Sequence, residues 1–318
     1  MPAKSVVLGF DTSCYTTSVA VMDLTGQLLE DRRQVLKVKQ GGCGLAQSEM
    51  VFQHTRNMPE LLELVEGFGA YDVRAIGVTA RPRPLAESYM PAFLVGLGTA
   101  RNLASVLQVP LYQFSHQENH LEAGLWSAQR PQAERFLLLH ASGGTTDILL
   151  VQAQGQQYQL TPCGGSIDLH AGQFIDRVGV ALGLGFPTGP ALEKLAQQAA
   201  EPELYPVAVK AGQISFAGPC TAVLRSLDKQ PAAAVALGTE YAIGKSLARC
   251  LVTLCQSEKV QAVLAVGGVA ANQCIRALIT KQLEAHGAKL YLPDARYSSD
   301  NAVGSAAYAL RQWECQHG

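Results

Sequence analysis

Two histidines, His116 and His120, stand four residues apart in the run His-Gln-Glu-Asn-His. On a helix this spacing puts both imidazoles on one face, so both can reach a single metal ion. Asp300, far downstream, offers a carboxylate as a third ligand. Two imidazoles and one carboxylate suit iron or zinc about equally, and they leave coordination positions open for substrate or water. A histidine pair at this spacing more often lies on a helix without binding a metal. The surrounding elements must therefore decide whether it forms a metal site.

The surrounding elements favour a site. Residues 109–115 predict a short strand that runs directly into the histidine helix, and α/β folds place their sites at strand ends. Hydrophobic periodicity predicts the other elements of this half. They are strands at residues 6–10, 17–23 and 73–79, a third strand of the opening meander from Leu28, a polar turn at 11–16, and helices at 51–67 and 91–107.

The opening pattern of strand, polar turn and returning strand recurs later in the chain. It occupies residues 10–21 and again residues 140–151, where Ser142-Gly-Gly-Thr-Thr forms the turn. Such turns can hold phosphates through backbone N–H groups and hydroxyls, although either turn alone would pass for an ordinary β-turn. The remaining expected elements are strands at 136–141, 147–152, 158–161, 262–266 and 290–292, a turn at 267–272, and helices at 168–182, 232–257, 273–286 and 301–312.

Two related halves of this kind are typical of the duplicated RNase H-like fold, which actin, the sugar kinases and the heat-shock ATPases share. The sequence therefore predicts an α/β protein with two domains that face each other across an interdomain cleft. We expect the first domain to comprise residues 1–124 plus 302–318 and the second to comprise residues 125–301. On this division the metal ligands come from both domains.

Composition narrows the function classes. The 25 basic and 26 acidic side chains give a formal net charge of -1, which argues against a dedicated nucleic-acid coat but leaves room for a local patch. The apolar run at residues 6–10 is too short for a signal segment or a membrane span. The 8 cysteines include no C-x-x-C pair, so reduced thiols in the cytoplasm are expected.

Taken in order, these segments resemble the tRNA threonylcarbamoyladenosine transferases over nearly the whole chain. The opening Val7-Leu-Gly-Phe-Asp-Thr-Ser-Cys is similar to that family's I-L-G-I-E-T-S-C, and Val109 to His120 follows its V-P-L-x-x-V-x-H-x-E-x-H without a gap. Further matching segments are Ser142-Gly-Gly-Thr-Thr, Ser166 to Asp176, Leu182 to Pro190, Ser215-Phe-Ala-Gly, Gly267 to Asn272 and Ser299-Asp-Asn.

The resemblance implies a function and a site. It implies a metal-dependent transferase that moves a threonylcarbamoyl or related carbamoyl group from an adenylate to tRNA adenosine, with the metal polarising the carbamoyl carbonyl. The implied metal ligands and catalytic residues are His116, His120 and Asp300. The residues implied to hold the adenylate, or another adenine nucleotide, are Asp11, Ser142, Gly143, Gly144, Asp176, Gly189, Gly267, Gly268 and Asn272.

Three departures mark a divergent member or a paralogue. Tyr15 replaces an acidic residue, Thr145 replaces a histidine, and Arg81-Pro-Arg replaces Gly-Pro-Gly. They motivate an alternative, in which the chain is a non-catalytic nucleotide-binding paralogue that acts as an interaction module. The resemblance also implies small paralogous and ATPase partner proteins. Membrane association is not expected, and a homodimer is left open.

Overall fold

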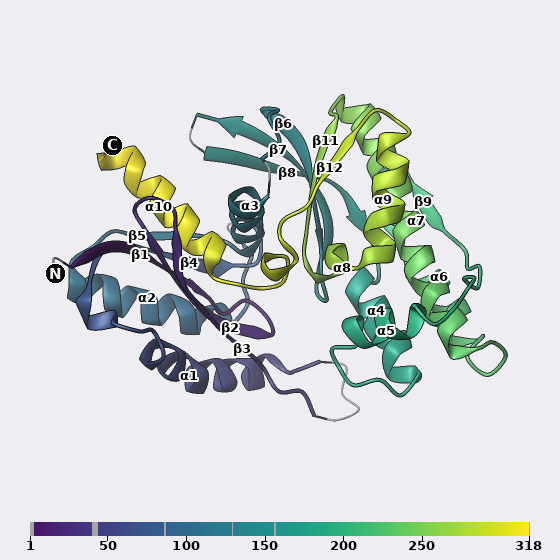
Figure 1. The fold of residues 1–318 in the computed structure, drawn as a ribbon, viewed down its shortest axis with the longest axis horizontal. Helices are drawn as coiled ribbons and strands as arrows, with labels where there is room; N and C mark the ends of the chain where they lie inside the picture. Colours follow the sequence, from purple (N-terminus) through teal and green to yellow (C-terminus); the bar gives the residue numbers. More distant parts are fainter. Residues whose placement is uncertain (1–2, 40–43, 86, 129, 156, 318) are drawn as a thin grey trace. The chain divides into compact units, whose positions relative to one another are not determined.

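The computed structural model describes residues 3–39, 44–85, 87–128, 130–155 and 157–317 (Figure 1). Cys43 therefore lies outside the described residues. The chain divides into two compact units. Unit 1 comprises Met1–Lys37, Leu45–Ala128 and Ser299–Gly318, and unit 2 comprises Val38–Gly44 and Gln129–Ser298. This division assigns Asp300 to unit 1, whereas the expected boundary at residues 301/302 placed it in the second domain.

Unit 1 is built on a five-stranded sheet with the order β3-β2-β1-β4-β5. Strands β1, β2 and β3 form an antiparallel meander, while β4 and β5 continue the sheet parallel to β1. The strands are β1 Lys4–Asp11, β2 Thr16–Asp23, β3 Leu28–Val35, β4 Tyr71–Arg81 and β5 Leu111–Ser115. The helices are α1 Gln47–Glu63, η1 Phe68–Ala70, α2 Phe93–Leu107, α3 His116–Ser127 and α10 Val303–His317.

Alternation along β1 sorts its side chains between the two faces of this sheet. Leu8 and Phe10 are fully buried in a cluster with residues of α1 and α2. Gly9 faces the opposite side, where α10 lies so close that a Cβ would stand 2.3 Å from the carbonyl oxygen of Ala302 (Figure 1). Asp11 follows Gly9 by two residues and therefore shares the α10 face.

Unit 2 is built on a seven-stranded sheet with the order β12-β11-β6-β7-β8-β10-β9. Its strands are β6 Arg135–Ala141, β7 Thr146–Gln154, β8 Gln157–Ser166, β9 Ala208–Lys210, β10 Gln213–Ser215, β11 Ala262–Val266 and β12 Lys289–Tyr291. Its helices are α4 Ala171–Ala181, α5 Gly189–Ala196, α6 Ala217–Leu224, α7 Ala232–Glu258, α8 Gly268–Ala271, α9 Gln273–Glu284 and η2 Ala295–Tyr297.

The two sheets repeat one topology. Strands β6, β7 and β8 form an antiparallel meander, and β11 and β12 continue the sheet parallel to β6. This series repeats the directions of β1, β2, β3, β4 and β5. The hairpins β1–β2 and β6–β7 coincide with the repeat at residues 10–21 and 140–151, which confirms the expected duplication. Strands β10 and β9 extend the second sheet beyond β8.

Several element boundaries differ from expectation. Helix α1 ends at Glu63 and not near Gly67, because Gly67 has a left-handed φ of 67° that no helix continues. Helix α4 begins at Ala171 and not at Asp168, because the Asp168 carboxylate accepts hydrogen bonds from the backbone of Leu169 and Phe216. The expected turn at 267–272 contains the short helix α8. Helices α5 and α6 and strands β9 and β10 are too short for periodicity to predict.

Candidate metal centre

The histidine helix α3 starts at a defined residue because a capping box fixes its first turn. The Ser115 hydroxyl accepts a hydrogen bond from the Glu118 backbone N–H at 3.3 Å, and the Glu118 carboxylate accepts one from the Ser115 N–H at 2.7 Å. The sequence Ser-His-Gln-Glu is the usual signature of this motif. His116 is therefore the first helical residue, directly after β5, as the sequence predicts.

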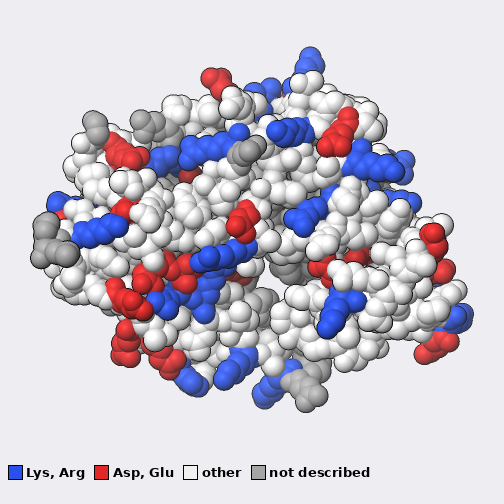
Figure 2. Space-filling model, in the orientation of Figure 1, with Lys and Arg blue, Asp and Glu red and all other residues white. Residues whose placement is uncertain are grey.

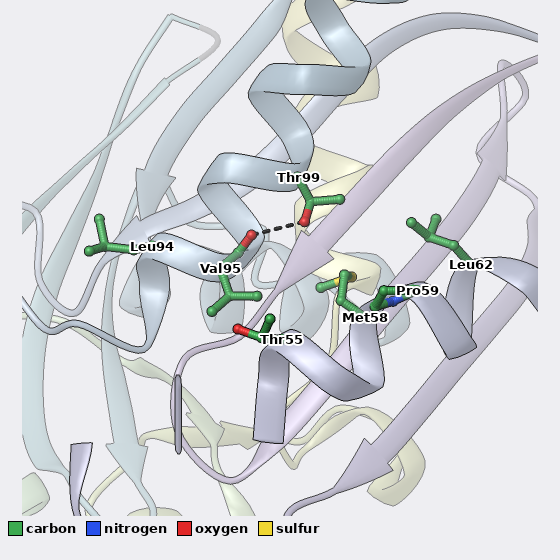
Figure 3. Close-up of a pocket in the computed structure, with 7 residues that line it drawn as sticks. All are labelled: Thr55, Met58, Pro59, Leu62, Leu94, Val95 and Thr99. Carbon is green, nitrogen blue, oxygen red and sulfur yellow. Dashed lines mark hydrogen bonds between the residues drawn. The ribbon is translucent and has the colours of Figure 1, made fainter. Parts of the chain in front are cut away.

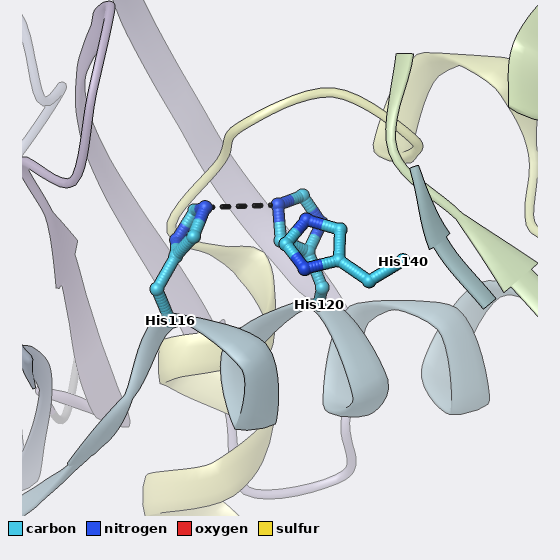
Figure 4. A group of neighbouring side chains, drawn as sticks. All are labelled: His116, His120 and His140. Atoms are coloured by element: carbon cyan, nitrogen blue, oxygen red, sulfur yellow. Dashed lines mark hydrogen bonds between the residues drawn. The ribbon is translucent and has the colours of Figure 1, made fainter. Parts of the chain in front are cut away.

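Two nitrogen atoms and one oxygen atom lie close together near the start of α3. The Nε2 atoms of His116 and His120 lie 3.1 Å apart (Figure 4). The Oδ1 atom of Asp300 lies 3.5 Å from the first Nε2 and 3.3 Å from the second. His140, which Figure 4 also draws, belongs to β6 of unit 2. The sequence-predicted triad is thus assembled within unit 1 alone.

The triad fits a metal ion in donor type and in spacing. Around a tetrahedral or octahedral ion with bonds of about 2.0–2.2 Å, neighbouring ligand atoms lie about 3.0–3.5 Å apart. The three separations of 3.1, 3.3 and 3.5 Å match one triangular face of such a coordination sphere. The Asp300 side chain is 17% exposed, whereas the His120 side chain is fully buried.

A polar clamp holds the Asp300 segment against α3. Asn119 lies between the two histidines, and its side-chain amide donates to the carbonyl of Asn301 at 2.7 Å. Ser305 donates to the Asn119 side chain at 3.1 Å. Gly304 permits this approach, because a Cβ there would stand 2.0 Å from the Asn119 carbonyl oxygen. The Asp300 carboxylate is therefore positioned by helix packing as well as by its own loop.

The three groups share charge in the absence of a metal ion. Burial disfavours the His116 cation, but the charges of Asp11 and Asp300 raise its pKa to about 10. Burial and the neighbouring His116 charge lower the pKa of His120. Burial acts to raise the pKa of Asp300, but hydrogen bonds from both histidines hold that pKa well below its usual range. A positive charge is therefore favoured between the two histidines and the carboxylate.

His54 supports this region and has no motif that would have revealed it. It is fully buried on α1, with Nδ1 2.8 Å from the Thr17 hydroxyl and Nε2 3.3 Å from the Cys14 carbonyl oxygen. Burial lowers its pKa, although the charges of Asp11 and Asp300 act in the opposite direction. A neutral imidazole thus ties α1 to the β1–β2 turn.

In unit 2 two glycine-containing turns lie at one edge of the sheet. Strands β6 and β11 are parallel neighbours, so the Ser142–Gly144 turn after β6 and the Gly267–Gly268 turn after β11 share that edge. Gly143 and Gly144 are exposed, and a Cβ on either would meet no atom within 4 Å. Gly267 has a φ of 95°, and a Cβ there would stand 2.2 Å from the Ala141 carbonyl oxygen.

Helix α4 connects this edge to Asp176 and Gly189. The Gly172 N–H, at the start of α4, donates to the Ser142 carbonyl at 3.1 Å. Asp176 follows one turn later, and its Oδ1 accepts from the backbone N–H of Thr188 at 2.8 Å. Gly189 comes next and begins α5. Burial raises the pKa of the Asp176 carboxyl, although both hydrogen bonds from Thr188 oppose that change.

Asn272 completes the cluster in unit 2. Its Oδ1 accepts from the Ile275 N–H at 2.9 Å and caps α9, while its Nδ2 donates to Glu240 at 2.7 Å. Glu193 of α5 accepts from the Gln273 N–H at 2.8 Å, which joins α5 to α9. The sequence-predicted residues Ser142, Gly143, Gly144, Asp176, Gly189, Gly267, Gly268 and Asn272 are thus linked within one unit.

Comparison with known proteins places the chain in a family. The family model of tRNA N6-adenosine threonylcarbamoyltransferase matches residues 47–307, which is most of the chain. The chain belongs to that family. A member from Thermus thermophilus is 33% identical, with 96% of this chain and 92% of the relative covered. A member from Granulibacter bethesdensis is 32% identical, with 93% and 85% covered.

Solved structures support the duplicated RNase H-like fold. An activator of 2-hydroxyisocaproyl-CoA dehydratase from Clostridium difficile aligns with a TM-score of 0.56 at 12% identity, covering 98% of this chain and 97% of that one. A glucokinase of the ROK family from Streptomyces griseus aligns with a TM-score of 0.56 at 11% identity, covering 96% and 99%. At such identities the likeness concerns the fold alone, and it confirms the predicted fold class.

The local contacts of the three departures from the motifs of the threonylcarbamoyltransferase family are as follows. Tyr15 packs on a small cluster with Leu36 and Met50, and its carbonyl accepts from the Leu36 N–H at 2.7 Å. Thr145 closes the hairpin turn, because its carbonyl accepts from the Ser142 N–H at 2.8 Å. After Arg81, the carbonyl of Pro82 accepts from an N–H in the first turn of α3.

A pocket elsewhere in unit 1 lacks catalytic groups. It lies between α1 and α2 and is lined by Thr55, Met58, Pro59, Leu62, Leu94, Val95 and Thr99 (Figure 3). The Thr55 hydroxyl donates to the Val51 carbonyl, and the Thr99 hydroxyl donates to the Val95 carbonyl. No lining residue carries an acid, a base or an imidazole. The histidine triad is therefore a better candidate for a catalytic site than this pocket.

Proposed function

We propose that the chain is a metal-dependent transferase that moves a threonylcarbamoyl group from an adenylate to tRNA adenosine. The observation that carries the proposal is the convergence of His116, His120 and Asp300 within 3.5 Å in a member of the threonylcarbamoyltransferase family. Relatives that match most of the chain are named for this activity. The alternative of a non-catalytic paralogue is not favoured, because the family match extends across both units.

The triad would hold one divalent ion, iron or zinc. When bound, such an ion supplies a Lewis acid that polarises the carbamoyl carbonyl. His116 and His120 contribute rigid ligands, since α3 fixes both. Asp300 neutralises charge at the exposed side of the site. This two-histidine, one-carboxylate set keeps coordination positions available for the donor.

The linked residues of unit 2 would bind the adenylate donor. Gly143 and Gly144 are exposed, and the backbone N–H groups of such turns can hold phosphate oxygens. The Asp176 carboxylate, fixed by Thr188, can accept hydrogen bonds from ribose hydroxyls. Gly189 leaves space beside the nucleoside, because a Cβ there would meet no atom within 4 Å. Asn272 is held in place by Glu240.

Family membership suggests the acceptor, the partner proteins and the cellular location of the proposed reaction. Acidic and basic side chains are interspersed on the face drawn in Figure 2, in keeping with the net charge of -1. We therefore expect protein partners, small paralogous and ATPase subunits, to contribute to tRNA binding. No helix in the described part of the chain is long and apolar enough to cross a membrane. A cytoplasmic location, where tRNA is found, is part of this proposal.

Reconstitution tests the proposal. The purified chain is incubated with tRNA, threonylcarbamoyl-adenylate and the partner proteins, and digested tRNA is analysed by mass spectrometry for the modified nucleoside. We expect modification with the wild type and with Glu284→Gln, an exposed substitution on α9. We expect a loss of at least about 100-fold with His120→Ala. Absence of modification by the wild type with every partner present would reject the transferase function.

A further inference from the structure

The Asp11 carboxylate lies behind the first metal-ligand candidate, on the side away from Asp300. Its Oδ1 lies 3.6 Å from Nδ1 of His116, while Nε2 of the same ring faces Asp300 at 3.5 Å. The two nitrogens of one imidazole thus face two different carboxylates. Alternation along β1 explains the placement, because Asp11 shares the sheet face of Gly9, against which α10 packs.

Asp11 is not available to a nucleotide. Its side chain is fully buried, at 0% exposure. The hydroxyl of Thr79 donates to Oδ1, and the hydroxyl of Ser13 donates to Oδ2 at 2.8 Å. Both carboxylate oxygens are therefore engaged by neighbours on the ends of β1 and β4. Because the side chain is fully buried, it does not present a surface for the contact with the adenylate that the family resemblance implies for this position.

We propose that Asp11 is a positioning residue that orients His116 as a metal ligand and strengthens its binding. A histidine that binds a metal through one nitrogen almost always donates its other N–H to a carboxylate, carbonyl or water. Here Asp11 selects the tautomer with the proton on Nδ1 and leaves the Nε2 lone pair directed at the triad. The Nδ1–Oδ1 separation of 3.6 Å is longer than a hydrogen bond, and a small ring rotation on metal binding would close it.

The ion-pair pattern supports this role. Within the described part of the chain, Asp11 forms its ion pair with an imidazole and not with a lysine or arginine. A buried carboxylate needs a compensating partner, because isolated burial of a charge is costly. The hydroxyls of Thr79 and Ser13 fix the orientation of the carboxylate but carry no charge. In the proposed site, the divalent ion bound to His116 would supply that charge.

This inference rests on the proposed metal-dependent function, and metal binding tests it without any turnover. Co²⁺ is titrated into the apo form of the full chain, and its visible absorption reports both affinity and ligand geometry. The test variant is Asp11→Asn, which keeps the shape and can still bond to Thr79. The matched control is Asp72→Asn, at the opposite end of β4, where the carboxylate contacts Ser5 and Arg74.

We expect Asp11→Asn to weaken Co²⁺ binding about 10–100-fold and to change its spectrum, with Asp72→Asn like the wild type. Thr79→Val is a second variant, which keeps the Asp11 charge but removes the hydroxyl that orients it. It should weaken binding less, and it replaces Asp11→Asn if that variant does not fold. Tight Co²⁺ binding by the wild type that neither variant alters would overturn the role of Asp11 and leave the transferase proposal standing. Absence of Co²⁺ binding by the wild type would overturn both.

Discussion

Asn119 on α3 donates its side-chain amide to the carbonyl of Asn301, the residue that follows Asp300. The two asparagines are separated by 182 positions in sequence, yet this bond joins the helix that carries His116 and His120 to the segment that carries Asp300. Both side chains are fully buried. The geometry of the triad therefore depends on a contact that involves none of its own members.

Replacing Asn119 with alanine should loosen the triad. It removes the donor to the buried Asn301 carbonyl, which costs about 1–3 kcal/mol of unfolding free energy, while the Ser305 hydroxyl keeps its bond to the Phe10 carbonyl. Urea denaturation checks the stability, and the Co²⁺ dissociation constant, expected to rise, checks the site. The control is Asn102→Ala, an exposed substitution on α2 that should change neither quantity. Wild-type metal affinity in a destabilised Asn119→Ala would show that the clamp does not position Asp300.

His120→Ala should lose most of the bound metal while the fold survives. One imidazole and one carboxylate are too few protein ligands for a tightly held ion. Metal content per chain, measured by elemental analysis, provides the comparison with the wild type. His286→Ala, an exposed substitution at the end of α9, serves as the control and should keep full occupancy. Equal metal content in His120→Ala and the wild type would place the metal elsewhere.

Glu240 should make the stability of the protein fall between about pH 4.5 and 7. Its pKa is raised from 4.5 to about 7, mainly by burial, with the Glu193 charge assisting and the Asn272 hydrogen bond opposing. The folded form therefore holds this proton more tightly than the unfolded form, and the stabilisation present at low pH is lost as pH rises through 7.

Glu240→Gln should abolish that loss, because the amide keeps the acceptor for Asn272 without the charge. Melting temperatures at pH 5 and pH 8 measure the effect. The variant should gain about 1–3 kcal/mol relative to the wild type at pH 8 and little at pH 5. Glu284→Gln on the exposed side of α9 should follow the wild type at both values. A parallel pH dependence in Glu240→Gln would contradict the assignment.

Gly9→Ala should disturb the metal centre through α10. A Cβ at Gly9 would stand 2.3 Å from the Ala302 carbonyl oxygen and 2.5 Å from the Ala306 nitrogen, both of them backbone atoms. The helix must move away, at a cost of about 1–3 kcal/mol or more. Gly69→Ala is the matched control, because a Cβ there meets no atom within 4 Å. Denaturant midpoints for both variants test the difference.

Local sequence signals predict the parts of the site that lie close together in the chain. The spacing of His116 and His120, and the Ser115–Glu118 capping pattern, depend on neighbours within one or two helical turns. The two hairpins follow from alternation and polar turns. These features depend only on nearby residues, so the sequence predicts them without knowledge of the fold.

Other parts depend on contacts between distant segments. No local pattern distinguishes a buried Asp11 from one that touches a nucleotide; only the Thr79 hydroxyl and the His116 ring reveal the difference. His54 likewise gains its meaning from Thr17 and Cys14, which lie on another element. The family resemblance marks Asp11 as a site residue, but it does not supply the direction in which the carboxylate points.

The chain order of unit 1 has a consequence for biosynthesis. His116 and His120 precede the whole of Gln129–Ser298, whereas Asp300 follows it. A nascent chain therefore exposes two imidazoles long before the ribosome adds the carboxylate. In the proposed metal site, tight loading would require that unit 2 has already been translated, so a bound ion would mark a chain in which both units have been made.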